Sequence, residues 1–293
     1  MHKSGFVNII GNPNVGKSTL MNALVGERLS IITSKAQTTR HRIMGIVSGD
    51  DFQIVYSDTP GVLKPQYKMH EGMMQFVKTA LSDADVILFV TDIFEKKVNN
   101  PEILERVQKT SIPVILIINK IDQASAEKID ELKNYWQTLL PNAEIVAISA
   151  LQKINTNTVI EKIKQHLPEG EPYFPKDQLT DKPERFFIAE IIREKIFLNY
   201  KKEVPYSCEV IVESYKEEPA IVKINAVIFV ARESQKPILI GDKGKAIKKV
   251  GTEARLEIEE FIQQKVFLDL TVKVSKDWRN NENILKRYGY INT

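Results

Sequence analysis

Short apolar runs recur along the first half of the chain, and helical patterns separate most of them. Runs rich in Val, Ile, Leu and Phe are typical of strands that are covered on both faces. The runs are 6–10, 52–56, 86–90, 114–118 and 144–148, and the helical segments include 17–25, 102–109, 128–139 and 159–167. This alternation predicts a three-layer α/β domain with a mostly parallel sheet. Gly49-Asp50-Asp51 is typical of a hairpin turn, so we expect residues 42–48 to form one antiparallel strand.

The second half of the chain follows a different order of elements. Helical periodicity or strand alternation marks 184–200, 206–213, 221–231, 246–264 and 266–274. A short helical segment and a glycine-containing loop come between the second strand and the last helix. The order of helix, strand, strand, short helix, loop, helix and strand predicts a smaller α+β domain.

A proline-rich segment, residues 168–183, separates these two patterns. It holds four of the 13 prolines of the chain, and clustered prolines are typical of linkers. The length of 293 residues also suits two domains. We therefore expect a first domain at 1–167 and a second at 184–293.

Composition narrows the class of protein. Apolar residues make up 43% and charged residues 27%, which excludes a wholly disordered or collagen-like chain. No apolar run approaches the ~18–20 residues that span a bilayer, and the first residues lack the signal-peptide pattern. The single cysteine, Cys208, fits a reducing compartment and is expected in the core rather than as a nucleophile. We therefore expect a cytoplasmic protein.

The strongest chemical signal is the segment from Gly11 to Ser18, which matches G-x-x-x-x-G-K-[ST]. It follows a predicted strand and opens a predicted helix, the context that a P-loop requires. Backbone N–H groups of such a loop surround phosphate oxygens, and the helix N-terminus adds partial positive charge. In this pattern Lys17 contacts the β- and γ-phosphates, and Ser18 offers its hydroxyl to Mg²⁺. The residues expected to bind the nucleotide are Asn12, Asn14, Val15, Gly16, Lys17, Ser18 and Thr19.

A second segment, Asp58-Thr59-Pro60-Gly61, ends the third predicted strand. Asp58 can hold Mg²⁺ through water, and the Gly61 N–H can contact the γ-phosphate. Alone this D-x-x-G pattern is weak, but after a P-loop it is the expected partner on the metal side.

A third segment, Asn119-Lys120-Ile121-Asp122, selects the base. A carboxylate at Asp122 accepts from guanine N1–H and the 2-amino group, whereas adenine would leave a buried Asp122 unpaired. We expect Asn119 and Lys120 to brace the loop and cover the ring. This argues against a P-loop ATPase or kinase, which is the alternative enzyme class.

A fourth segment, Ser149-Ala150-Leu151, follows the next strand and is expected to place a backbone N–H near guanine O6. All four segments lie at the carboxyl ends of strands. The carboxyl ends of parallel strands face one edge of the sheet, so we expect a single crevice there.

In the second half, residues 240–245 read Ile240-Gly241-Asp242-Lys243-Gly244-Lys245. A G-x-x-G between two helical segments, flanked by strands in this order, is the pattern of a type II KH domain. Such a loop packs against the backbone of single-stranded RNA, and its glycines allow phosphates to approach. Residues 236–249 hold five lysines against one aspartate, which adds attraction for phosphates. An ordinary solvated helix face is the alternative.

With both halves considered, the chain resembles Era-type GTPases, in the group that includes TrmE and EngA, over nearly its whole length. The resemblance implies that Thr39, in Thr38-Thr39-Arg40, binds Mg²⁺ in the GTP state. It implies that Asn14 helps to hold K⁺, and that Lys17, Thr39 and Gly61 serve catalysis. The partner implied is small-subunit ribosomal RNA near its 3′ end, with a role in ribosome assembly.

Two positions refine these expectations. Ras-type GTPases place a water-orienting Gln directly after D-x-x-G, and Val62 stands there in this chain. We therefore expect slow intrinsic hydrolysis, and an RNA scaffold that barely turns over GTP stays an alternative. Trp278 is expected to pack in the core, with stacking on an RNA base as the other reading. The resemblance permits peripheral contact with the inner membrane. A protein- or membrane-directed switch is a third alternative, and we expect a monomer with no DNA partner.

Overall fold

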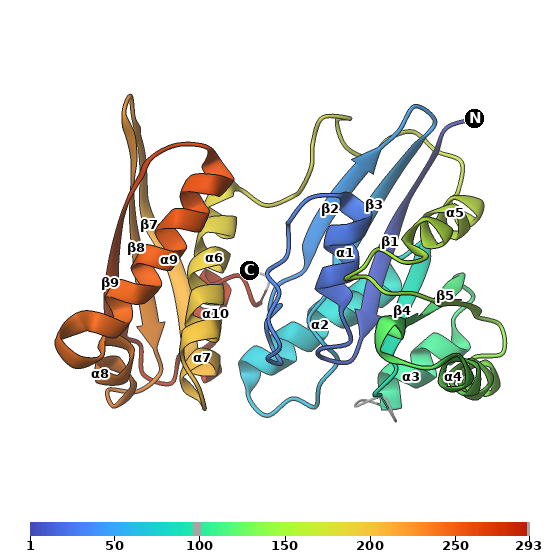
Figure 1. Ribbon diagram of the computed structural model, residues 1–293, viewed down its shortest axis with the longest axis horizontal. Helices are drawn as coiled ribbons and strands as arrows, with labels where there is room; N and C mark the ends of the chain where they lie inside the picture. The colour runs from blue at the N-terminus through green and yellow to red at the C-terminus, as the bar shows by residue number, and fades with distance from the viewer. Residues whose placement is uncertain (96–100, 292–293) are drawn as a thin grey trace. The chain divides into compact units, whose positions relative to one another are not determined.

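The computed structural model describes residues 1–95 and 101–291, which form two compact units (Figure 1). Unit 1 comprises Met1–Gln66 and His70–Asp181, and unit 2 comprises Tyr67–Met69 and the chain from Lys182 onward. No helix in the described part of the chain is long and apolar enough to cross a membrane.

Unit 1 is built on a six-stranded sheet with the order β2-β3-β1-β4-β5-β6. The strands are β1 Lys3–Gly11, β2 Ile43–Ser48, β3 Phe52–Asp58, β4 Val86–Asp92, β5 Val114–Asn119 and β6 Glu144–Ala147. All neighbouring strands are parallel except β2 and β3, which form the predicted antiparallel hairpin. The predicted α/β fold with one antiparallel strand is confirmed. Because β1, β3, β4 and β5 end in polar or glycine positions, their carboxyl ends bring the functional segments to one edge.

The helices that accompany this sheet are α1 Lys17–Val25, α2 Lys68–Ser82, α3 Pro101–Lys109, α4 Ala126–Leu139 and α5 Thr156–His166. Helix α1 packs on β1, β2 and β3 and contacts α5, whereas α4 packs on β5 and β6. Sequence analysis named no helix at α2. Its buried side chains Met69, Met73, Val77 and Leu81 recur every fourth residue, which explains why it folds against apolar surface.

Residues 168–181, in the segment predicted as a linker, belong to unit 1; the first of them bond to His2 and Ser4, and the last bond to β2. The Ile46 N–H donates to the Leu179 carbonyl at 2.8 Å, and the Thr180 hydroxyl donates to the Met44 carbonyl at 2.7 Å. Prolines remove N–H donors but leave carbonyls free to accept, so a proline-rich segment can still pair with the edge of a sheet.

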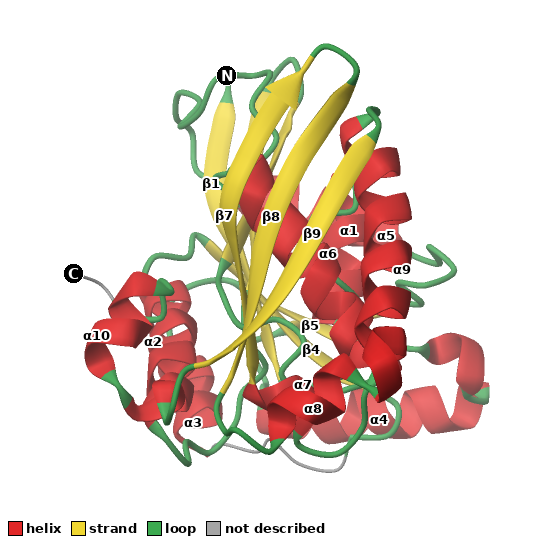
Figure 2. Cartoon of the chain, turned by 90° about the vertical axis from the view of Figure 1, so that its left-hand side faces the viewer, coloured by secondary structure: helices red, strands yellow, loops and turns green. Residues whose placement is uncertain are grey.

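Unit 2 is a three-stranded sheet, order β7-β8-β9, with helices on one face (Figure 2). Its main elements are α6 Glu184–Asn199, α7 Val204–Ser207, β7 Cys208–Glu218, β8 Ile221–Val230, α8 Gln235–Ile240, α9 Lys245–Ile262 and β9 Val266–Val274. β7 and β8 are antiparallel and β8 and β9 parallel. Helices α6 and α9 contact each other and cover the sheet, and their apolar faces form the core with it. The predicted α+β unit is confirmed.

The chain continues past β9 into η3 Trp278–Asn280 and α10 Glu282–Arg287, which sequence analysis did not predict. Trp278 is fully buried, and its indole N–H donates to the Ser207 carbonyl at 2.9 Å. The reading of Trp278 as a base-stacking residue is therefore wrong, because its ring faces the core. Cys208 is also fully buried, as expected.

Candidate nucleotide and RNA sites

The P-loop between β1 and α1 has the backbone that phosphate binding requires. Gly16 caps α1 with φ +94° and Asn14 has φ +67°, so the chain passes twice through left-handed conformations. A Cβ on Gly16 would lie 2.2 Å from the Asn119 side-chain nitrogen, which leaves room for glycine alone. These turns aim successive N–H groups into one concavity at the helix N-terminus.

Lys17 lies buried at the start of α1, and its ammonium donates to the Asn12 carbonyl at 2.8 Å. Burial lowers the pKa of Lys17 to about 8, and the nearby carboxylates of Asp58 and Glu95 offset part of that effect. The ammonium thus stays mostly charged at neutral pH, although it is shielded from water. A bound phosphate would add further negative charge beside the ammonium.

Three oxygen side chains meet beside this lysine. The Ser18 hydroxyl donates to Asp58 Oδ2 at 2.7 Å and lies 2.8 Å from the Thr39 hydroxyl. Thr39 in turn donates to the same carboxylate oxygen at 3.3 Å. Ser18, Thr39 and Asp58 come from α1, from the loop before β2 and from the end of β3, so tertiary folding alone brings them together.

Asp58 is fully buried, and burial raises the pKa of its carboxyl even though Lys17 and nearby hydroxyls lower it. Its Oδ1 accepts no hydrogen bond from the residues that the structure describes. A buried carboxylate oxygen without a partner is costly unless a cation or water completes it. Hard oxygen donors in this arrangement fit Mg²⁺, which prefers carboxylates, hydroxyls and water.

Asn119, the last residue of β5, ties the base-binding segments to the P-loop. Its amide donates to the Val15 carbonyl at 2.9 Å, and its oxygen accepts the Ala150 N–H at 3.0 Å. Lys120 follows in a left-handed turn with φ +66°. The Asn119 side chain therefore sets the spacing between the phosphate and base ends of the site.

Asp122 and Ser149 complete the base side. A hydrogen bond with Ser149 lowers the pKa of Asp122 below its usual range, so its carboxylate is ionised at neutral pH. Asp122 is only partly buried, unlike the buried carboxylate expected from sequence. Both residues face a cleft, and guanine would bury Asp122 by occupying it.

This P-loop cleft has a volume of about 370 Å³. The predicted residues that line it are Asn14, Gly16, Lys17, Ser18, Thr19, Thr39, Gly61, Asn119, Lys120, Asp122, Ser149 and Leu151. The predicted residues that lie behind the wall are Asn12, Val15, Asp58 and Ala150, each less than 10% exposed. These buried residues hold the lining residues in place through the hydrogen bonds to Lys17, Ser18 and Asn119.

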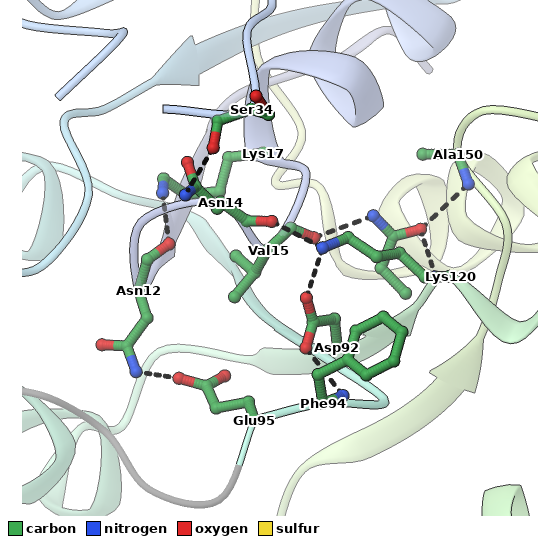
Figure 3. Close-up of polar contacts among 11 residues, drawn as sticks. Asn12, Asn14, Val15, Lys17, Ser34, Asp92, Phe94, Glu95, Lys120 and Ala150 are labelled. Atoms are coloured by element: carbon green, nitrogen blue, oxygen red, sulfur yellow. Dashed lines mark hydrogen bonds and ion pairs between the residues drawn. The ribbon is translucent and has the colours of Figure 1, made fainter. Parts of the chain in front are cut away.

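The residues predicted from sequence do not include Asp92, which ends β4, or Phe94 and Glu95, which follow it at the same edge. Asp92 forms an ion pair with Lys120, and Glu95 accepts a hydrogen bond from the Asn12 side chain (Figure 3). Burial raises the pKa of Glu95 to about 7. The signal was available, because Asp92 ends a buried parallel strand and such ends face the ligand crevice.

Val62, the residue after D-x-x-G, is fully buried, and its N–H donates to the Gly11 carbonyl at 3.0 Å. Its side chain can orient no water. Gly61 packs against the P-loop, since an added Cβ would lie 2.7 Å from the Pro13 Cα. The Gly61 backbone therefore runs beside the region where phosphates would lie.

In unit 2, the 240–245 loop joins α8 to α9. Gly241 and Gly244 have φ +71° and +78°, and Lys243 has φ +48°. A Cβ on Gly241 would lie 2.5 Å from the Ala246 Cβ, whereas one on Gly244 would meet no atom within 4 Å. Gly241 thus closes the turn, and Gly244 presents bare backbone to solvent.

Exposed lysines and a shallow groove extend from this loop along α9. Lys243, Lys245, Lys248 and Lys249 are exposed, and Lys245 makes only a 3.5 Å contact with the equally exposed Asp242. A shallow groove of about 260 Å³ lies between α9 and β9; it is lined by Ile247, Lys248, Gly251, Thr252, Arg255, Leu268 and Leu270. An apolar floor with a basic rim suits bases and phosphates, respectively.

Comparison with known proteins agrees with both units. Residues 6–120 match the family described as 50S ribosome-binding GTPase, and residues 203–279 match the KH domain family. GTPase Era of Geotalea daltonii is 45% identical over 289 residues, which span 98% of this chain and 97% of that protein.

Solved structures give the same result. Era in complex with MgGDPNP and nucleotides 1506–1542 of 16S ribosomal RNA is 40% identical, with a TM-score of 0.95 over 99% of each chain. A variant of Aquifex aeolicus Era bound to GDP·AlF₄⁻ is 41% identical, with a TM-score of 0.92 over 98% of this chain and 99% of that one.

Proposed function

Because the chain belongs to the Era family of GTPases, we propose that it hydrolyses GTP in the P-loop cleft and binds the 3′ region of 16S ribosomal RNA through unit 2. The observation that carries this proposal is the meeting of the Ser18, Thr39 and Asp58 oxygens beside the buried Lys17. Such a cluster matches the γ-phosphate and metal side of a GTPase.

Each residue of the cleft has a role in this proposal. Ser18 and Thr39 hold Mg²⁺ directly and Asp58 holds it through water; the bound ion stabilises negative charge on the phosphates. Lys17 adds positive charge at the β- and γ-phosphates, and the Gly61 N–H donates to the γ-phosphate. Asp122 accepts from the guanine N1–H and 2-amino group.

Hydrolysis in this cleft is slow, because Val62 cannot orient the attacking water. We propose that a K⁺ ion, held by the Asn14 side-chain oxygen, stabilises part of the negative charge that develops on the phosphates during hydrolysis. The Asn14 amide donates to the Ser34 carbonyl at 3.0 Å, which leaves its oxygen available to a cation. Hydrolysis should then be faster in K⁺ than in Na⁺, and Asn14→Ala should abolish the difference while keeping GDP binding. Equal rates of the parent protein in both salts would contradict this role.

On the RNA side, the 240–245 loop accepts the RNA backbone at Gly244, and the lysines of α9 add attraction. The chain acts as a monomer in small-subunit assembly, and the nucleotide state sets when it holds RNA. The family resemblance also permits a peripheral membrane contact.

Gly244→Asp tests the RNA half, because it adds a carboxylate where a phosphate approaches. Gly26→Asp is the matched control: Gly26 also has a positive φ and open space but caps α1 in unit 1. Binding of a 3′ fragment of 16S RNA should fall in Gly244→Asp and persist in Gly26→Asp, with GDP binding kept in both. Full RNA binding by Gly244→Asp would overturn the assignment.

A further inference from the structure

The base-side lysine of the cleft is held by groups that do not belong to its own motif. The Lys120 ammonium donates to the Asn14 carbonyl at 2.7 Å and lies 2.5 Å from Asp92 Oδ2. It also lies 5.7 Å from the centroid of the Phe94 ring. Figure 3 shows the lysine reaching from β5 across to the P-loop, with Asp92 and Phe94 on its other side.

Asp92 is placed for this contact by the sheet itself. It is the last residue of β4, and the parallel register of β4 and β5 pairs it with Asn119, the neighbour of Lys120. Its side chain is 7% exposed, and its second oxygen accepts the Phe94 N–H at 2.9 Å. Each carboxylate oxygen therefore has a partner, and the bond to the Phe94 N–H orients the other oxygen toward the Lys120 ammonium.

We propose that Asp92 is a positioning residue for guanine-nucleotide binding, which holds Lys120 against the P-loop before the nucleotide arrives. A free lysine side chain has many rotamers, and ordering it on binding weakens affinity. An ion pair of low exposure orders it in advance and at the same time fixes the Asn14 carbonyl. The inference rests on the proposed use of the cleft.

Its position gives Asp92 a distinct kinetic signature. It touches the lysine on the base side, and the cluster of Ser18, Thr39 and Asp58 lies at the phosphate side. Removing its charge should therefore weaken ground-state and transition-state binding equally. KM for GTP should rise, and kcat at saturating GTP should stay unchanged.

A double-mutant cycle separates positioning from general stability. Asp92→Asn should raise the Kd for GDP by about tenfold, as loss of a charged hydrogen bond does. In a Lys120→Ala background, the same Asp92→Asn change should have no further effect. Additive effects on Kd, or an unchanged Kd in Asp92→Asn, would overturn the proposal.

Two further variants complete the design. Asp85→Asn alters a carboxylate at the opposite end of β4, which accepts the Phe6 N–H at 2.8 Å, and should leave the GDP Kd unchanged. Should Asp92→Asn not fold, Asp92→Glu carries the test. It keeps the charge but shifts the lysine, so Kd should rise about threefold and only when Lys120 is present; an unchanged Kd overturns the proposal.

Asp122→Asn in the same assay distinguishes the two failures. If it leaves GDP affinity unchanged, the assignment of the cleft fails. If it weakens GDP binding while Asp92→Asn does not, only the role of Asp92 fails.

Discussion

Around Lys17 in the P-loop cleft, polar side chains are mostly buried and hydrogen-bonded to one another, whereas those of the 240–245 loop are exposed and make few contacts with the residues that the structure describes. Lys17 and Asp58 are both less than 10% exposed, while Lys245 and its partner Asp242 are 79% and 74% exposed. A buried network is ordered for one ligand before binding. An exposed basic loop instead offers charge and space, which suits a flexible polyanion.

The two glycine turns offer the largest contrast. Gly16→Ala places a Cβ 2.2 Å from the Asn119 nitrogen and should displace the side chain that joins the two ends of the cleft. We expect kcat/KM for GTP to fall about 100-fold, as for other losses of positioning. Steady-state hydrolysis with purified protein checks this.

Gly244→Ala is the matched change in the 240–245 loop. It adds a Cβ in open space, so only the positive φ opposes it, at roughly 1–2 kcal/mol of unfolding free energy. GTP hydrolysis should be unaffected, and melting should fall by a few degrees. Equal kinetic losses in Gly16→Ala and Gly244→Ala would remove the contrast between the two regions.

Asp122→Asn addresses base selection in the cleft. The change replaces an acceptor with a donor opposite the guanine 2-amino group, so GTP affinity should fall at least about tenfold. Affinity for xanthosine triphosphate should rise, because its 2-oxygen can accept a hydrogen bond from the Asn amide. Competition binding of the two nucleotides measures both effects, and unchanged GTP affinity would refute the role of Asp122.

The difference between the regions also explains what sequence could predict. Buried parallel strands have a continuous apolar signal, and four motif segments stand at their ends, so the sheet and most of the cleft wall were predictable. The place of Asp92 at the end of a buried strand was a usable signal, but its partner Lys120 and the contact of Glu95 with Asn12 depend on neighbouring strands and loops rather than on spacing along the chain.

Outside the cleft, the elements that were not predicted from sequence depend on tertiary contacts. α10 is six residues long and carries little periodic signal, although Trp278 beside it is fully buried. Residues 168–181 have the prolines of a linker, but the Leu179 carbonyl and the Thr180 side chain pair with β2. Neither feature follows from local pattern, because the partner segments lie far away in sequence.

A smaller effect concerns pH. Burial holds the pKa of Lys17 near 8 in the free protein, and bound phosphates would raise it. At a pH between the Lys17 pKa of the free protein and that of the complex, GDP binding is accompanied by protonation of Lys17. GDP affinity should therefore fall as pH rises above 8. Proton uptake by Lys17 on GDP binding should therefore be larger at pH 8.5 than at pH 7. Calorimetry in buffers of different ionisation enthalpy measures this, and equal uptake at both values would contradict a lowered Lys17 pKa.

The smallest effects are expected for single lysines of the exposed loop. Lys243→Ala and Lys245→Ala should each reduce the slope of log affinity for RNA against log salt by about 0.7. Neither should change melting, because Lys245 contacts only an exposed carboxylate. Slopes equal to that of the parent protein would show that these lysines do not contact phosphate.

The central claim is that one chain joins a GTP-dependent switch to an RNA-binding loop. It is tested most directly by measuring affinity for the 3′ fragment of 16S RNA with GDP and with a non-hydrolysable GTP analogue. We expect the two RNA affinities to differ by about 5- to 150-fold, and RNA should shift affinity for the analogue relative to GDP by the same factor. Gly244→Asp should weaken RNA binding in both states. Identical RNA affinities in the two nucleotide states would contradict the claim.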